Sequence, residues 1–158
     1  MFRKMRRSKQ QLNDAESQAI LSDPKNTHGV LAVNGDDGYP YAAPISFVWD
    51  DGSLWIHMAL SGHRFDSLQE DSKVCFTVVD SDETDEAGYT AKFRSVVVFG
   101  HAYLVEDDEE RCSALELFTS KYAQHRPKEE RFEKAHSCTR SAIFRIEPEH
   151  ITGKRSNH

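Results

Sequence analysis

The stretch Gly52–Asp66, GSLWIHMALSGHRFD, decides how the rest of the chain is interpreted. Its first half alternates aliphatic side chains with other residue types, and this period of two predicts a β-strand. Mostly small residues follow at positions 59–62, where they let the backbone turn sharply and come close to a ligand. His63 and Arg64 then begin a short predicted helix. The stretch therefore predicts a strand, a tight turn and a helix in succession.

The start of this predicted helix has the features of an anion site. The first N–H groups of a helix lack intrahelical partners, and the helix dipole adds partial positive charge. Arg64 adds a planar guanidinium group that can hold a phosphate through two hydrogen bonds. A phosphate-binding turn is the first hypothesis for this stretch. An ordinary strand–helix junction with a surface arginine fits the same residues, and the pattern alone does not choose between them.

Length and charge limit the kinds of protein that this chain can be. Its 158 residues suit one domain with a substantial core. The formal net charge is −6, so the molecule as a whole repels nucleic acid, and no nucleic-acid partner is expected. No apolar run approaches the roughly 20 residues that span a bilayer, and the N-terminus lacks the apolar core of a signal peptide. We therefore expect a cytoplasmic protein without a membrane partner.

Cysteine and histidine residues show no metal-binding pattern. The three cysteines, Cys75, Cys112 and Cys138, are far apart in the sequence, which fits neither a disulfide framework nor a zinc site. The eight histidines include no pair at a recognised ligand spacing. No metal site is expected.

The remaining patterns predict a meander of strands with a few helices. Residues 1–12 are predicted to form a flexible basic arm and residues 13–158 a single domain. The predicted strands are residues 30–33, 39–49, 54–58, 73–79, 91–105 and 141–146, and the predicted helices are residues 13–21, 63–69, 106–123 and 127–132. The acidic stretch Asp80–Tyr89 is interpreted as a solvated loop, and the last strand is expected to stop at Pro148. This order predicts a mainly β fold, a six-stranded antiparallel β-barrel with flanking α-helices.

Prolines and a glycine predict irregular places in two of these strands. Residues 39–49 include Pro40 and Pro44. Because proline has no N–H group to donate, parts of this strand must lie at an edge or a bulge, with free carbonyl groups. In the longest strand, Gly100 predicts a bend or a bulge.

Four segments together resemble the pyridoxamine-phosphate-oxidase-like family of FMN-binding split barrels and, within it, the nitroimidazole-resistance-type flavoproteins. The segments are residues 38–44 (GYPYAAP), 57–66 (HMALSGHRFD), 93–102 (FRSVVVFGHA) and 151–154 (ITGK). The resemblance extends over about residues 12–155. It implies a split β-barrel that forms a homodimer with FMN at the subunit interface.

The resemblance also implies roles for individual residues. Arg64 stands where the family holds the FMN phosphate, and Ala59 and Gly62 would let the backbone approach the phosphate and the ribityl chain. Arg94 and Ser95 would face the same groups from the longest strand, although a surface charge and a core hydroxyl are the alternatives for these two. The flavin ring would be lined, through backbone groups, by Tyr41, Ala42, Ala43 and Pro44.

His57 is the candidate catalytic residue. The nitroimidazole-resistance-type proteins, which this chain resembles, also carry a histidine near the flavin at this strand end. Histidine has a pKa near neutrality, so it could give a proton to a substrate that FMN reduces. A strand-end histidine that is bonded to the backbone is the structural alternative.

These implications predict an FMN-dependent oxidoreductase that reduces a small acceptor, nitroaromatic or related, with NAD(P)H as the donor. The C-terminal end reads Thr152–Ser156 and lacks the arginine-centred motif of the true pyridoxamine phosphate oxidases, so vitamin B6 oxidation is not expected. No Gly-x-Gly-x-x-Gly follows a strand, so the donor would have to visit the flavin without a dinucleotide domain. The alternatives on the same fold are a deazaflavin-dependent reductase, a flavin reductase, and a non-catalytic module that stores or senses flavin or haem.

Overall fold

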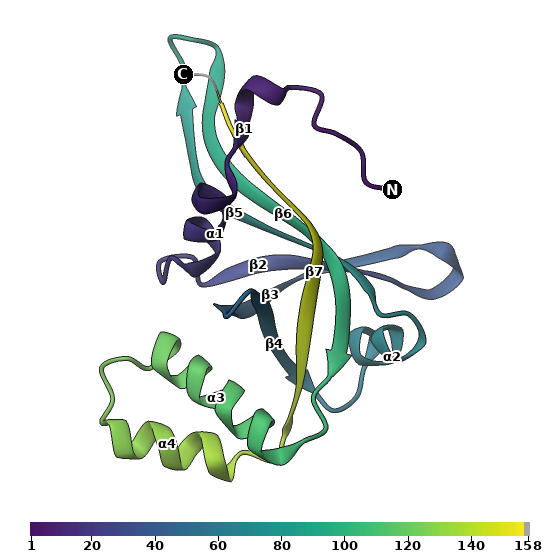
Figure 1. The fold of residues 1–158 in the computed structure, drawn as a ribbon, viewed down its shortest axis with the longest axis vertical. Helices are drawn as coiled ribbons and strands as arrows, with labels where there is room; N and C mark the ends of the chain where they lie inside the picture. The colour runs from purple at the N-terminus through teal and green to yellow at the C-terminus, as the bar shows by residue number, and fades with distance from the viewer. Residues whose placement is uncertain (157–158) are drawn as a thin grey trace.

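The computed structural model describes residues 1–156, which contain seven β-strands and four α-helices (Figure 1). The strands are β1 (Gln11–Leu12), β2 (His28–Asn34), β3 (Pro40–Asp50), β4 (Ser53–Ala59), β5 (Lys73–Asp85), β6 (Thr90–Leu104) and β7 (Ser141–Arg155). The α-helices are α1 (Asp14–Ser22), α2 (His63–Glu70), α3 (Asp108–Tyr122) and α4 (Lys128–Ser137). Short 3-10 helices cover Ser8–Gln10 and Asp36–Gly38.

Six of the strands close into a ring. Their order is β7-β4-β3-β2-β5-β6, and a further pairing between β6 and β7 completes the circle. Every pair of neighbours is antiparallel, and β1 adds to the outside edge of β7. The predicted fold, a six-stranded antiparallel split β-barrel with flanking α-helices, is confirmed.

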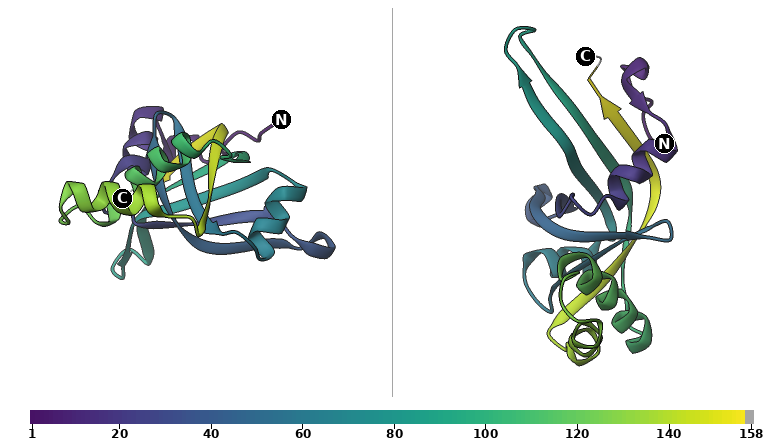
Figure 2. Two further views of the ribbon diagram at one scale, coloured as in Figure 1. Left: turned by 90° about the horizontal axis from the view of Figure 1, so that it is seen from below. Right: turned by 90° about the vertical axis from the view of Figure 1, so that its left-hand side faces the viewer.

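The barrel interior is filled by side chains that alternate along the strands. Its largest fully buried members are Phe47, Phe76 and Phe144. A second, smaller cluster lies under α3 and α4, where Leu115 and Ile143 are buried together. Figures 1 and 2 show α3 and α4 packed side by side at one end of the molecule, with the β5–β6 hairpin projecting at the other end. Along residues 1–156, each helix is too short or too polar to cross a membrane.

Two sequence-based boundaries were wrong. The acidic stretch Asp80–Tyr89 is not a loop, because β5 and β6 remain paired out to Asp85 and Thr90. Its charges indicate exposure to solvent, and a two-stranded ribbon satisfies that as well as a loop does. The last strand also continues past Pro148 to its end at Arg155.

A bulge explains how the last strand accommodates its proline. The register between β6 and β7 shifts between Phe99 and Gly100, and Pro148 lies opposite Gly100 at that point. A proline is tolerated there because a bulge already interrupts the ladder of hydrogen bonds. The predicted irregularity at Gly100 is therefore confirmed.

The N-terminal elements match the sequence in part. Asn13 and Glu16 form a reciprocal capping box, with hydrogen bonds of 2.8 and 2.9 Å. The two residues before it belong to the sheet, because β1 pairs with Gly153 and Lys154. The sheet thus begins inside the segment predicted as an arm. Helix α4 is also longer than predicted and ends at Ser137.

Candidate functional site

The turn between β4 and α2 presents free hydrogen-bond donors. Gly62 is the N-cap residue of α2, and its φ of 120° lies in a region that side-chain-bearing residues rarely adopt. No side chain caps the helix, so the N–H groups of its first turn, from His63 onward, lack intrahelical acceptors. A Cβ atom added at Gly62 would meet nothing within 4 Å. Gly62 and His63 are exposed, so an anion from solvent can approach the positive end of the helix dipole.

Arg64 lies beside this turn with its guanidinium group only partly satisfied. Its Nη2 donates a hydrogen bond of 3.3 Å to the carbonyl oxygen of Pro44. Its Nε is buried and has no hydrogen-bond partner among the described residues. None of the ion pairs within residues 1–156 includes Arg64. Because a buried charged donor without an acceptor is costly, this geometry suits an anionic ligand.

Strand β3 has a free edge next to Arg64. It pairs with β4 only over Phe47–Asp50, whereas residues 40–46 pair with β2 alone. Pro44 has no N–H group, so it cannot form the two hydrogen bonds of a bonded pair with its partner residue on β2. The carbonyl group of Pro44 therefore points to the opposite, free edge of β3. The contact with Arg64 agrees with that orientation. Ala42, two residues away, has its N–H and carbonyl groups on the same free edge.

An apolar surface that remains partly open to solvent lies around this edge. Its side chains come from the outward positions of β3, β2, β5 and β6, and the strand register sets them in rows across the sheet. We call this surface the open face; its residues are Ala42, Pro44, Val30, Ala32, Thr77, Val79, Val97 and Phe99. Val79 keeps 58% and Phe99 38% of its surface exposed.

The four residues predicted to line a flavin ring alternate about β3. Ala42 and Pro44 lie on the open face and are exposed. Tyr41 faces the core and packs against the ring of His63, with ring centroids 4.2 Å apart. Ala43 alternates to the same side as Tyr41. The backbone N–H and carbonyl groups of Tyr41 and Ala43 point to their partners on β2, so the free edge offers a ligand the backbone groups of Ala42 and the carbonyl group of Pro44.

The other predicted cofactor residues fall into two groups. Ala59, Gly62 and Arg64 come together at the β4–α2 turn. Arg94 and Ser95 lie on β6, three strand spacings or about 14 Å from β3 across the sheet. Successive strand residues point to opposite faces, so Ser95, opposite Val79, lies on the open-face side of β6, and Arg94 lies on the other side, where it pairs with Asp80.

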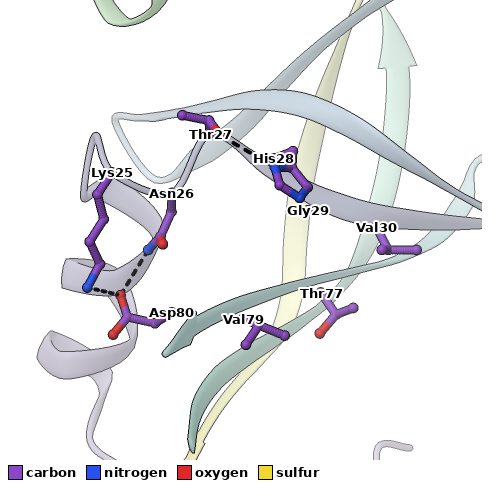
Figure 3. A pocket seen from close by; sticks show the side chains of 9 residues that line it. All are labelled: Lys25, Asn26, Thr27, His28, Gly29, Val30, Thr77, Val79 and Asp80. Atoms are coloured by element: carbon purple, nitrogen blue, oxygen red, sulfur yellow. Dashed lines mark hydrogen bonds and ion pairs between the residues drawn. The ribbon is translucent and has the colours of Figure 1, made fainter. Parts of the chain in front are cut away.

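A small pocket lies beside the open-face residues Val30, Thr77 and Val79 (Figure 3). It has a volume of about 390 Å³ and is lined by Lys25, Asn26, Thr27, His28, Gly29, Val30, Thr77, Val79 and Asp80. The carboxylate of Asp80 accepts a 3.0 Å hydrogen bond from Asn26 and pairs with Lys25 at 3.2 Å and Arg94 at 3.5 Å. Burial raises the pKa of Asp80, but these partners outweigh it and hold the pKa below its ordinary value. Sequence reasoning missed this residue because it stood in the supposed acidic loop.

His57 lies on the outer side of β4, beneath α3. Its ring packs edge-to-face against Phe118 of α3, with centroids 4.7 Å apart. Burial lowers the pKa of His57 below its ordinary value of 6.5, so the neutral imidazole predominates at pH 7. Two residues, or about 7 Å of strand, separate it from Ala59 at the turn. His57 thus lies two residues before the end of β4 with its side chain packed against α3, and the sequence did not indicate the contact with Phe118.

The described residues fit an anion joined to a flat group. The turn and Arg64 supply donors for the anion, and the free edge of β3 supplies backbone donors and acceptors beside an apolar surface. Within residues 1–156, no group of three or more histidine, cysteine or acidic side chains is arranged to hold a metal ion. Fold and site together define a split β-barrel protein with a candidate anion-binding turn beside the free edge of β3.

Comparison with known proteins identifies the family. The sequence profile described as "Pyridoxamine 5'-phosphate oxidase" matches residues 13–155, and the chain belongs to that family. No match was found among curated proteins.

Solved structures of similar fold agree with this assignment. A candidate 5-nitroimidazole antibiotic resistance protein from Bacteroides thetaiotaomicron is 18% identical, with a TM-score of 0.74 over 92% of this chain and 86% of that one. An FAD-binding protein from Mesorhizobium loti is 22% identical, with a TM-score of 0.66 over 93% and 97%. The flavocytochrome Anf3 from Azotobacter vinelandii is 19% identical, with a TM-score of 0.72 over 98% and 73%. At these identities the similarity shows the shared fold.

Proposed function

We propose that this protein binds FMN and acts as an FMN-dependent oxidoreductase that reduces a small acceptor, nitroaromatic or related, with NAD(P)H as the donor. The observation that carries the proposal is the partly satisfied guanidinium group of Arg64 beside the uncapped start of α2. The free edge of β3 next to it offers the backbone groups that a flavin ring needs. The similar structures described as FAD-binding, as a flavocytochrome and as a nitroimidazole resistance protein support a flavin.

Each part of the site would have one task. Arg64 and the first N–H groups of α2 would bind the phosphate, and Ala59 and Gly62 would leave room for the ribityl chain. Within the segment Tyr41–Pro44, the backbone groups at the free edge, those of Ala42 and the carbonyl group of Pro44, would orient the ring edge. The apolar open face would exclude water. FMN, when bound, supplies the hydride chemistry.

We further propose that the protein is a homodimer that joins through the open face. Large exposed apolar surfaces mark interfaces, and a two-fold dimer could bring Arg94 and Ser95 of one subunit toward the Arg64 side of the other. Light scattering should give twice the 18.0 kDa mass of the chain.

The variant Val79→Lys tests where the dimer joins. A lysine at this exposed position of the open face should weaken association without unfolding the barrel. Phe132→Lys is the matched control, because Phe132 is similarly exposed, at 54%, but lies on α4. Equal effects of the two variants on the dimer dissociation constant would remove the interface from the open face.

We expect His57→Ala to retain FMN while slowing turnover about tenfold, which corresponds to about 1.4 kcal/mol of activation free energy. The side chain lies beneath α3 rather than at the β4–α2 turn, so it could transfer a proton to the substrate without binding the cofactor. Titration of FMN and steady-state kinetics on the same preparations measure both effects. Loss of FMN as severe as in a phosphate-site variant would make His57 a binding residue.

The same histidine gives a pH dependence of stability. Because burial lowers the pKa of His57 in the folded state, the unfolded state takes up the proton first as the pH falls below 6.5. Stability from this group is therefore present above pH 6.5 and lost below it. His57→Ala should lose less unfolding free energy than the wild-type protein between pH 7 and pH 5.

The spectrum of the purified protein tests the proposed activity. A flavin spectrum that NADH or NADPH bleaches under nitrogen, and that a nitroaromatic acceptor restores, is the expected result. A flavin that neither donor reduces would indicate a flavin-holding module instead. A Soret band would indicate a haem protein, and failure to bind either flavin or haem would overturn the proposal.

A further inference from the structure

The first ten residues carry positive charge that the rest of the described chain does not pair. We call residues 1–10 the basic arm; its charged side chains are all exposed and are Arg3, Lys4, Arg6, Arg7 and Lys9. None of the ion pairs within residues 1–156 includes any of them. Five cations in ten residues repel one another unless carboxylates lie nearby.

The tip of the β5–β6 hairpin carries the opposite charge. We call residues 81–90 the acidic ribbon, and it projects beyond the barrel (Figure 1; right-hand view of Figure 2). Strand β7 ends opposite Arg94, so farther out the two strands of the ribbon pair only with each other. A two-stranded ribbon is marginally stable by itself in water. Three of its acids are exposed and form no ion pair within residues 1–156: Asp82, Glu83 and Glu86.

The basic arm and the acidic ribbon lie at the same end of the molecule but do not contact each other through any ion pair of the described chain (Figure 1). One residue of the arm, Phe2, instead contacts the open face. The ring of Phe2 stacks on His150 at 4.9 Å and lies 5.3 Å from the ring of Phe99, an open-face residue. The start of the arm therefore lies at the border of the surface through which we propose the dimer to join.

We propose that the basic arm of one subunit binds the acidic ribbon of its partner in the homodimer. The inference rests on the dimer proposed above and assigns it a second, charged contact. Ten residues reach up to about 33 Å when extended, which is enough to cross a subunit border. Two-fold symmetry makes the contact occur twice, because each subunit supplies one arm and one ribbon. The contact also gives the projecting ribbon the neighbour that it lacks within one chain.

Two charge-reversed variants test the contact. The arm variant carries Arg3→Glu, Lys4→Glu, Arg6→Glu and Arg7→Glu, and the ribbon variant carries Asp82→Lys, Glu83→Lys and Glu86→Lys. A control variant reverses three exposed acids around α3 and α4: Glu106→Lys, Glu129→Lys and Glu133→Lys. Asp85 is left unchanged because it pairs with Lys92 and bonds the ribbon turn.

Each variant alone should raise the dimer dissociation constant at low salt by about 10- to 100-fold, since like charges then face each other twice. The control variant should change it by less than about threefold. Mixing the arm variant with the ribbon variant should restore association, because both contacts of the mixed dimer join opposite charges again. Native mass spectrometry should then find well above the statistical half of the dimers as heterodimers, and high salt should abolish this preference.

The mixing experiment separates a contact between subunits from one within a subunit. A statistical heterodimer fraction would overturn the proposal, because charges paired within one chain gain nothing from a differently charged partner. Variants that dimerise as tightly as the wild-type protein would overturn it as well and would leave the open-face dimer intact. A wild-type protein that is monomeric in light scattering would instead remove the dimer itself.

Discussion

Replacing Arg64 with alanine is expected to weaken FMN binding by about 10- to 150-fold and to leave riboflavin binding almost unchanged. A hydrogen bond from a charged donor contributes about 1.5–3 kcal/mol, and about 1.4 kcal/mol corresponds to a factor of ten in affinity. Riboflavin lacks the phosphate that the guanidinium group would hold. Titration of both flavins into deflavinated wild-type and variant protein measures the difference.

Two further variants make this experiment specific. Arg64→Lys keeps the charge but loses the planar fork, so its affinity for FMN should fall between those of the wild-type protein and Arg64→Ala. Arg126→Ala is the control, because Arg126 is an exposed arginine paired with Glu130 on the surface. If Arg64→Ala weakens both flavins equally, Arg64 only orders the turn. An acidic partner such as Asp66 would predict that result, but no ion pair within residues 1–156 joins the two.

The strand–turn–helix geometry of the candidate anion site could be predicted from the sequence because its parts are local. The strand, the turn at Gly62 and the start of α2 follow one another within a few residues, and their backbone geometry depends on residue type at each position. The prolines of β3 likewise indicated a strand with unpaired backbone groups. These groups lie at the free edge of β3, in the part of the strand before Phe47. The barrel fold followed from the order of the six predicted strands, which are joined mostly as a meander.

Contacts between distant segments could not be predicted in this way. Asp80 contacts Asn26, Lys25 and Arg94. Asn26, for example, precedes Asp80 by 54 residues in the sequence. The acidic composition of Asp80–Tyr89 favoured a loop, because charged side chains indicate exposure to solvent but do not indicate whether the backbone pairs with another strand. The position of His57 under Phe118 depends on how α3 folds back over the barrel, and no local pattern carries that information.

Replacing Gly100 with alanine is expected to destabilise the barrel by about 3 kcal/mol, at the upper end of the usual cost of overpacking. A Cβ atom at this position would lie 2.3 Å from the carbonyl oxygen of Glu147 and 3.1 Å from the Cα atom of Pro148. Both are backbone atoms, so no side-chain rotation relieves the overlap, and β6 and β7 must separate at the bulge. Urea unfolding of the wild-type and variant proteins measures the loss.

Gly52→Ala is the matched control for this prediction. Gly52 has a φ of +75° and nothing within 4 Å of an added Cβ, so its replacement adds backbone strain without a clash and should cost only about 1 kcal/mol.

Gly100→Ala should also disturb function, because the neighbouring Phe99 belongs to the open face and contacts Phe2 of the basic arm. If the dimer dissociation constant of Gly100→Ala rises as its unfolding free energy falls, the bulge is linked to the interface. If the two glycine substitutions lower the unfolding free energy equally, the strands can shift at the bulge to make room for the Cβ atom. The close approach of β6 and β7 would then not determine the geometry of the open face.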